Sequence, residues 1–315
     1  MRTARTGTTS GPVLGAWKCG VAAFRGIPYA APPVEARRFA PPQPPVPWAE
    51  ARDARAAGPA APQGPSMLAP VLGTEAIVQR EDGCLTVNVF TPGMDGRRPV
   101  LLWLHGGAFV TGYAGGPRQS GARLAARGEI VVVTANYRLG PLGYLYLDEP
   151  GPDGDGNAGL LDQIAALRWV HDNAAAFGGD PDLITVAGHS AGALSAAAVA
   201  VSPLAAGLAR RVMLASPQLG SVTTAQRAAQ ETRGYLDRLG ADVDQLRALP
   251  AGELVKVAAE QAAERGPAGA PPSLVLGGAG LPRDIGEALA DSDLDLMLGT
   301  TRDEARAFLA CDPAA

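Results

Sequence analysis

The sequence predicts an α/β protein built around a doubly wound, mostly parallel sheet, and three patterns near its centre predict it. Residues 100–104 and 130–134 are unbroken apolar runs, which are typical of strands covered on both faces. Residues 159–177 place apolar side chains at helical spacing, and another apolar, β-branched run follows at 183–187. Strands that alternate with helices favour a parallel sheet with its site at the carboxyl ends of the strands.

The remaining elements follow from shorter patterns, and the whole chain, 1–315, is interpreted as one domain. We expect a β-hairpin at 12–17 and 21–24, a proline-rich extended path at 28–47, an exposed loop at 56–78, an alternating strand at 85–90, a short helix at 119–127, and strands at 212–215 and 294–298. Residues 223–265 are charged, alanine-rich and helical in pattern. We interpret 223–290 as a cap segment over the edge of the sheet.

Composition and charge exclude several classes of protein. The net charge is −4 with a pI near 5.5 and no basic block, so nucleic acid is not expected as a partner. No run of about 18 apolar residues predicts a membrane span. Arg2 and Arg5 precede no apolar run, so we expect no signal peptide and a cytoplasmic protein. An odd set of cysteines without metal-ligand spacing, Cys19, Cys84 and Cys311, predicts no disulfide framework.

One short segment, 187–193, carries the strongest indication of chemistry. It places Ser190 between Gly188 and Gly192, after an apolar strand and before an alanine-rich helix. The sequence G-x-S-x-G in that context predicts a nucleophile elbow, although the five residues alone also occur by chance. The Ser190 hydroxyl would then stand at the carboxyl edge of the sheet. The N–H of Ala191 would point from a helix start, where developing negative charge is stabilised.

A second segment, 103–109, ends a core strand with two glycines, Gly106 and Gly107, after His105. Without side chains in the way, backbone N–H groups there can face a substrate oxygen. Loops of this H-G-G type supply the second donor of the oxyanion hole in lipases and esterases. A glycine turn with a purely structural role is the alternative.

Longer motifs point to a family. Residues 177–192 resemble throughout the active-serine motif of the type B carboxylesterases, an α/β-hydrolase branch that includes the cholinesterases, and 82–92 resemble its second motif. Three shorter segments match in the same order: 24–30, 136–140 and 159–163. The resemblance covers essentially the whole chain. It implies the α/β-hydrolase fold and a carboxylic ester hydrolase that forms an acyl-serine intermediate on a small-molecule ester, with no metal or organic cofactor.

The resemblance also implies roles for individual residues. Ser190 becomes the nucleophile, and the oxyanion hole takes its N–H groups from Gly107, Ala108 and Ala191. The triad acid falls on Glu304, beside Asp303, in the motif at 299–305. Further pocket residues are His189, Gly106 and Phe109.

Two other expectations also rest on the resemblance. Arg38 is expected to form a structural salt bridge with either Glu81 or Asp82, without a catalytic role. No tryptophan lies between Trp48 and Trp103, so the aromatic choline site of the cholinesterases looks absent and choline esters are disfavoured.

The sequence departs from the family's pattern at two places. The residue before the serine is usually glutamate and is here His189. The family's triad histidine lies well downstream of the acid, whereas eleven residues follow Glu304. Of the three histidines, His105 belongs to the oxyanion loop, His171 lies within a helix and His189 adjoins the serine. None of them is an evident general base.

These departures leave three hypotheses open. The first is an ester hydrolase that is C-terminally incomplete and impaired without its histidine. The second is a non-catalytic, hydrolase-like binding protein. The third is a residual esterase in which His189 or a partner chain supplies the base. Lacking the family's last strands, the sheet is expected to end at 294–298 with an unpaired edge that invites self-association.

Overall fold

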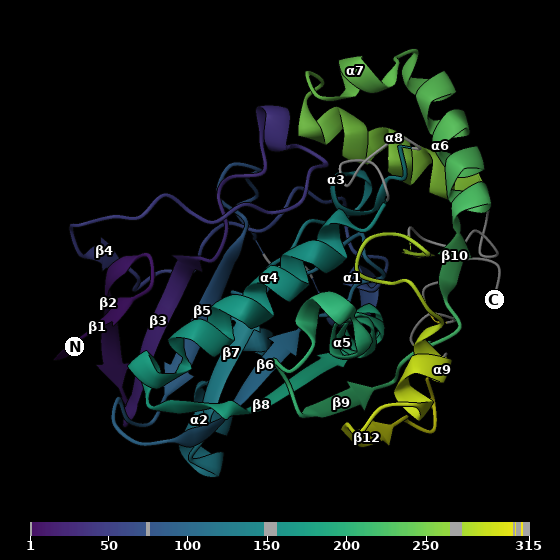
Figure 1. Cartoon of the computed structure of the whole chain (residues 1–315). Coiled ribbons are helices and arrows are strands. Elements are labelled where there is room, and N and C mark those ends of the chain that lie inside the picture. Colours follow the sequence, from purple (N-terminus) through teal and green to yellow (C-terminus); the bar gives the residue numbers. More distant parts are fainter. Residues whose placement is uncertain are drawn as a thin grey trace.

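The computed structural model describes residues 2–73, 76–147, 156–264, 273–304, 306 and 310. Ten strands within these residues form one mixed sheet: β1 (Arg2–Thr8), β2 (Gly11–Lys18), β3 (Val21–Pro28), β4 (Arg52–Asp53), β5 (Thr86–Thr91), β6 (Arg98–Leu104), β7 (Val131–Ala135), β8 (Gly179–His189), β9 (Arg211–Ala215) and β12 (Asp295–Gly299). Their order is β1-β2-β3-β5-β7-β6-β8-β9-β12, with β4 beside β2 (Figure 1). Neighbours are antiparallel from β1 to β7 and parallel from β7 to β12.

Helices cover both faces of this sheet and stand over one edge of it (Figure 1). The described helices are α1 (Ala69–Leu72), α2 (Ala122–Gly128), α3 (Pro141–Tyr144), α4 (Ala158–Asn173), α5 (Ala191–Val201), α6 (Ala225–Leu239), α7 (Val243–Leu246), α8 (Ala251–Glu264) and α9 (Ile285–Ala290). The helices α4, α5 and α9 pack on one face, and α2 packs on the other. The helices α6 to α8 stand above the sheet, and the short strands β10 (Val222–Thr224) and β11 (Leu274–Leu276) pair below them.

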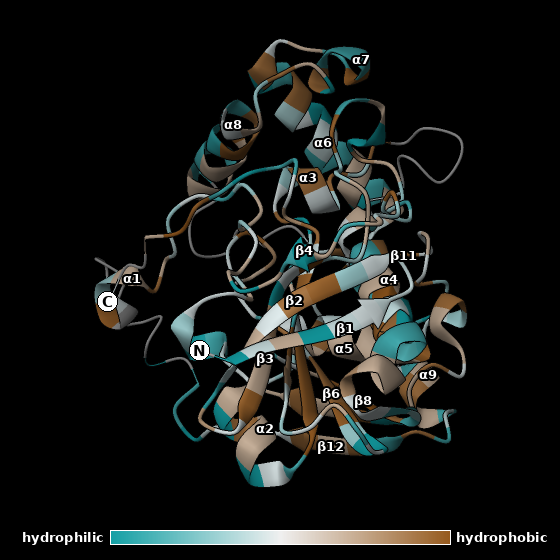
Figure 2. Cartoon of the chain, turned by 90° about the vertical axis from the view of Figure 1, so that its left-hand side faces the viewer, coloured by the Kyte–Doolittle hydropathy of each residue, from teal (hydrophilic) through white to brown (hydrophobic). Residues whose placement is uncertain are grey.

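The apolar face predicted for the long helix is confirmed in α4, where Leu160, Ile164 and Leu167 are all buried. Figure 2 shows hydrophobic colour along parts of strands β3 and β6 of the sheet. The predicted hairpin is confirmed as β2 and β3. Strand β1 was not expected, because its sequence has no apolar alternation and buries only Ala4 along its length.

Two strands differ from their predicted exposure. Strand β5 alternates in sequence, yet all six of its side chains are buried. Its polar Asn88 is satisfied inside the protein, where its amide donates to the Ala114 carbonyl and to the Thr134 hydroxyl. Conversely, Leu101 and Trp103 of β6 are only partly buried. The helix that covers this face, α2, has seven residues and lies mainly over β3, β5 and β7, so it leaves part of β6 uncovered.

Strand β12 pairs with β9 and with no other strand of the described chain. Its apolar side chains are uncovered, with Leu296, Met297 and Leu298 exposed by 51%, 66% and 52%. An unpaired apolar edge is therefore present within the described residues. Self-association through it stays a prediction.

The described helices include none that is long and apolar enough to cross a bilayer. Cys19 is an exposed free thiol and Cys84 a buried one, whereas Cys311 lies outside the described residues. Residues 265–272 of the expected cap segment also lie outside them.

Arg38 pairs with Glu81, through Nε to Oε1 at 2.7 Å and Nη2 to Oε2 at 2.5 Å, whereas Asp82 pairs with Arg80. The other terminal nitrogen of Arg38 donates to three carbonyls around the end of α7, those of Leu246, Arg247 and Leu249. Arg247 in turn donates to the carbonyl of Arg38. We call this reciprocal set the arginine latch, because it joins the proline-rich segment to the helices above the sheet.

A buried ion pair supports the loop after β7. Nε and Nη2 of Arg138 each donate to a carboxylate oxygen of Asp162 at 2.7 Å, and the backbone N–H of Arg138 adds a third hydrogen bond at 3.0 Å. Both side chains are almost completely buried, with exposures of 2% and 0%. Arg138 also donates to the Ala40 and Ala158 carbonyls, so the pair joins three separate segments.

Candidate active site

Four neighbouring parallel strands end at one edge of the sheet, and each delivers a polar group or loop there. Strand β6 leads into the glycine loop at 105–109, and β8 leads into Ser190. Strand β9 is followed by Ser216, and β12 leads to Glu304. Groups that follow adjacent parallel strands meet at the carboxyl edge, where open α/β sheets bind their ligands.

Ser190 sits at the sharp turn between β8 and α5, with φ 56° and ψ −124°. Its N–H donates to the Ala215 carbonyl at 2.9 Å, which ties the turn to β9. A Cβ at Gly192 would lie 2.2 Å from the Leu104 carbonyl oxygen, so only glycine permits this approach. The Ser190 hydroxyl does not cap the helix that follows it. The strained serine of the predicted elbow is therefore held out toward the edge.

The glycine loop faces this serine. A Cβ at Gly106 would lie 3.2 Å from the Ser190 Cβ, so the two backbones meet closely. Gly107 and Ala108 both have positive φ, at 125° and 53°. Within the described chain, the N–H groups of Gly107, Ala108 and Ala191 donate to no acceptor. Three free donors in this loop and helix start are the kind of group that can stabilise an oxyanion.

Phe109 is buried beneath this loop, and its place in the pocket stays a prediction. Its ring packs on that of Tyr144, with centroids 4.7 Å apart, and its carbonyl accepts the Gly140 N–H at 2.7 Å. Its φ of 61° shows that the loop is held in an unfavourable conformation by this packing.

His105 and His171 are each occupied away from the serine. The His105 ring stacks on Tyr137 with centroids 4.4 Å apart, and burial lowers its pKa to about 4. Its carbonyl accepts the Tyr137 hydroxyl at 2.5 Å. A histidine that is buried and neutral in this way supports the loop. His171 lies near the end of α4, partly exposed, with its Nδ1 3.3 Å from Asp172.

His189 is the histidine that the structure brings to the site. It is exposed, and its Nδ1 would lie 3.2 Å from a Cβ at Gly106, the same distance as the Ser190 Cβ. Its charge also contributes to lowering the pKa of Glu304. The imidazole therefore borders the glycine loop beside Ser190.

Glu304 is held by two hydrogen bonds to one carboxylate oxygen, from the Ser216 hydroxyl and the Thr301 N–H, both at 2.6 Å. The hydroxyl of Ser216 lowers the pKa of Glu304 most, followed by that N–H. Ser216 has φ 53° and donates its N–H to the Gly299 carbonyl. Sequence reasoning missed Ser216. Its position, directly after a strand that neighbours the elbow strand, is the signal that points to it.

Replacing Ser216 with alanine is expected to raise the pKa of Glu304 toward its ordinary value. The lost hydrogen bond stabilises the charged carboxylate, so without it the proton binds at higher pH. The stabilisation that the ionised Glu304 carboxylate contributes is present above the pKa of this group in the folded protein. It is lost as the pH falls through that pKa. In the variant this loss therefore begins at a higher pH. A ¹³C NMR titration of the Glu304 carboxyl measures the shift, and Ser221→Ala, which removes an exposed hydroxyl, is the control. Identical Glu304 titrations in wild type and Ser216→Ala would contradict it.

Comparison with known proteins identifies the chain's family. The sequence model of the Carboxylesterase family matches residues 1–315. The chain belongs to this family. Para-nitrobenzyl esterase of Bacillus subtilis (strain 168) is 42% identical over 321 residues, covering 97% of this chain and 64% of that protein. Phenmedipham hydrolase of Pseudarthrobacter oxydans is 40% identical, covering 97% of this chain and 62% of that protein.

Solved carboxylesterases share the fold. A Geobacillus stearothermophilus carboxylesterase superposes with a TM-score of 0.88 at 40% identity, covering 98% of this chain and 64% of that one. A thermophilic para-nitrobenzyl esterase gives 0.90 at 38% identity, covering 99% and 65%. The predicted α/β-hydrolase fold is confirmed by these neighbours. The chain spans less than two thirds of the length of each of these four relatives.

Proposed function

We propose that this chain carries the nucleophile, the oxyanion hole and the acid of a carboxylic ester hydrolase. The observation that supports this best is Ser190 in its strained turn, opposite the free N–H groups of Gly107, Ala108 and Ala191. Glu304, whose carboxylate accepts a hydrogen bond from Ser216, follows β12, and β12 is separated from β8 by β9.

The reaction that fits this arrangement is acyl transfer in two steps. The Ser190 oxygen attacks the ester carbonyl, and the carbonyl oxygen becomes an anion that the three N–H groups stabilise. The C–O bond to the alcohol then breaks, the alcohol leaves with a proton, and an acyl-serine remains. Water hydrolyses that ester in the second step and restores the hydroxyl. Ser190 needs a base to take its proton, and His189 is the described histidine that borders it.

The substrate class we propose is carboxylic esters of small molecules. The relatives are named a para-nitrobenzyl esterase, a phenmedipham hydrolase and a fumonisin B1 esterase. Each name describes a hydrolase of a small molecule. The helical segment above the carboxyl edge, residues 223–264, is proposed as the cap that borders this substrate.

The proposal is tested by trapping the covalent intermediate. The protein is incubated with 4-nitrophenyl acetate, quenched in acid and digested, and the peptides are analysed by mass spectrometry. One acetyl group is expected on the peptide that contains Ser190, because the strained turn presents that hydroxyl to the ester. Acetylation spread over surface lysines and the amino terminus, with the Ser190 peptide unmodified, would contradict the proposal.

A further inference from the structure

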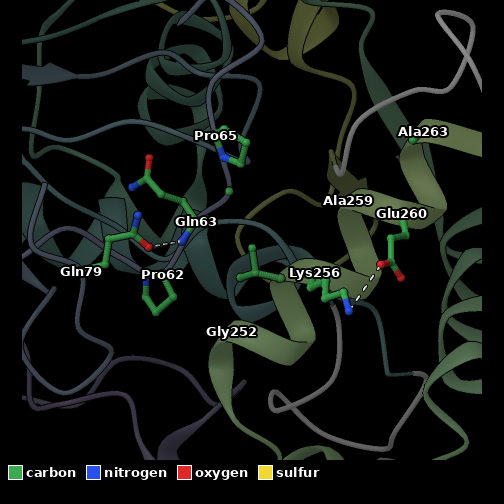
Figure 3. A pocket seen from close by; sticks show the side chains of 11 residues that line it. Pro62, Gln63, Pro65, Gln79, Gly252, Lys256, Ala259, Glu260 and Ala263 are labelled. Atoms are coloured by element: carbon green, nitrogen blue, oxygen red, sulfur yellow. Dashed lines mark hydrogen bonds and ion pairs between the residues drawn. The ribbon is translucent and has the colours of Figure 1, made fainter. Parts of the chain in front are cut away.

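Gln63 holds Gly112, the residue at which the chain leaves the glycine loop. Its Nε2 donates to the Gly112 carbonyl at 2.8 Å, and its Oε1 accepts the Gly112 N–H at 2.8 Å, across 49 positions of sequence. The backbone of Gln63 is fixed in turn, because its N–H donates to Oε1 of Gln79 at 2.9 Å. Figure 3 shows this last hydrogen bond beside the hollow that residues 62–65 form with α8. The side chain of Gln63 therefore occupies both backbone groups of one residue near the site.

Gly112 packs against the beginning of the glycine loop. A Cβ at Gly112 would come within 2.1 Å of Nδ1 of His105 and 2.6 Å of the Gly106 carbonyl oxygen, so only glycine fits there. That Nδ1 lies 3.0 Å from the same carbonyl oxygen, and it must carry the hydrogen because a carbonyl only accepts. The Gly106 carbonyl is thus held on the side of His105 and Gly112. In a planar trans peptide the N–H of Gly107 then points to the opposite side.

The next peptide unit is fixed in the same way. The Gly107 carbonyl accepts the N–H of Val110 at 3.0 Å, the N–H of Thr111 at 2.9 Å and the Thr111 hydroxyl at 3.3 Å. The N–H of Ala108 therefore points away from these three donors. Because Thr111 directly precedes Gly112, the hydrogen bonds from Gln63 also restrain the residue that makes two of these contacts.

The glycine loop needs such restraint because its backbone is strained. Ala108 and Phe109 have φ values of 53° and 61°, in a region that residues with a Cβ rarely adopt. Such a conformation persists only where the surrounding structure holds it. A rotation of either peptide unit would place a carbonyl oxygen where an N–H now lies, and a carbonyl oxygen repels a developing oxyanion.

We propose that Gln63 is a positioning residue for the oxyanion hole. By holding Gly112 in place, it keeps the two loop carbonyls turned inward and the N–H groups of Gly107 and Ala108 turned outward. This inference rests on the proposed function, because it assigns those N–H groups to the oxyanion.

The first test measures acylation of Ser190 in Gln63→Met, which keeps the length of the side chain and removes its amide. The first release of 4-nitrophenolate from 4-nitrophenyl acetate is followed before the steady state, over a range of ester concentrations. We expect the acylation rate constant to fall by about 10–100-fold, somewhat less than the roughly 10²–10³-fold loss from removing a whole oxyanion donor. The dissociation constant of the ester should change by less than about 2-fold, because these N–H groups act on the transition state.

Two further variants separate positioning from general stability. Gln63→Asn keeps the amide but is too short to reach both groups of Gly112, so it should slow acylation as Gln63→Met does. Tyr113→Phe is the matched control, since the Tyr113 hydroxyl donates to the Gly58 carbonyl at 2.8 Å and so joins the same two parts of the chain without bonding to Gly112. It should acylate at the rate of the unmodified chain. Thermal unfolding of each variant shows that it is folded.

The second test needs no catalysis. The amide ¹⁵N chemical shift of a residue responds to the hydrogen bonds that the preceding carbonyl accepts, so the signals of Gly107 and Ala108 report on both loop carbonyls. These two signals are expected to shift or broaden in Gln63→Met and to stay unchanged in Tyr113→Phe.

Unchanged acylation in both Gln63 variants, equal slowing in Tyr113→Phe, a weaker dissociation constant that accounts for the whole loss, or unchanged ¹⁵N signals would each overturn the role of Gln63. Absence of acylation in the unmodified chain would instead count against the proposed function. The ¹⁵N spectra would still decide whether Gln63 orients the loop.

Discussion

Hydrolysis of 4-nitrophenyl acetate by the Ser190→Ala variant is expected to fall by about 10³-fold or more relative to the unmodified chain. The oxygen that would carry the acyl group is gone, so only binding and the oxyanion N–H groups can still assist attack by water. Initial rates, corrected for spontaneous hydrolysis and measured on protein free of host esterases, give the ratio. The fold should be unchanged, because alanine tolerates the same backbone and the Ser190 hydroxyl makes no helix cap.

Ser221→Ala is the control for this experiment, because it removes an exposed hydroxyl. Its rate is expected to equal that of the unmodified chain. Undiminished turnover by Ser190→Ala, with thermal unfolding like that of the unmodified chain, would show that another group performs the attack.

Replacing Asp162 with alanine is expected to destabilise the chain by about 3–5 kcal/mol, because it leaves the buried Arg138 guanidinium without its counter-ion. Three hydrogen bonds disappear, including one to the backbone of Arg138. The midpoint of urea unfolding should fall sharply with little change in slope. If the Asp162→Ala variant does not accumulate as soluble protein, the loss of folding stability is large enough to prevent folding.

The matched control is Asp53→Ala, which breaks another aspartate–arginine pair that also has bidentate geometry. Asp53 and Arg55 are exposed by 59% and 60%, so solvent screens the pair and replaces its hydrogen bonds. The midpoint is expected to stay where it was. Equal midpoints for Asp162→Ala and Asp53→Ala would refute the importance of the buried pair.

Much of the fold was predictable because its central strands and helices are locally determined. The apolar runs that became β6, β7 and β8 are hydrophobic enough to require burial in any arrangement. Strand β1 was not predictable, since its polar sequence is extended only because β2 offers it a hydrogen-bonding edge. The burial of β5 likewise depends on Ala114 and Thr134, which satisfy Asn88 from distant parts of the chain.

The candidate site also contains residues that the sequence indicates and residues that it does not. The elbow and the glycine loop are short, contiguous motifs with strict backbone requirements, so the sequence alone indicates Ser190 and Gly107. The Ser216 hydroxyl acts on Glu304, 88 residues away, and the Gln63 side chain exchanges two hydrogen bonds with the backbone of Gly112, 49 residues away. Neither residue belongs to a contiguous motif. The electrostatic influence of His189 on Glu304 also depends on strands β8, β9 and β12 lying next to one another.

The arginine latch has a consequence for the order in which the chain acquires its structure. Arg38 donates to carbonyls that lie 208, 209 and 211 residues further along. A ribosome adding about 5–20 residues per second needs roughly 10–40 s to produce them after Arg38 has been made. Until then, Glu81, which itself lies 43 residues after Arg38, is the one partner of the guanidinium among the contacts described. The proline-rich segment is therefore synthesised well before the carbonyls that complete its contacts, and it is among the last parts to reach its final arrangement.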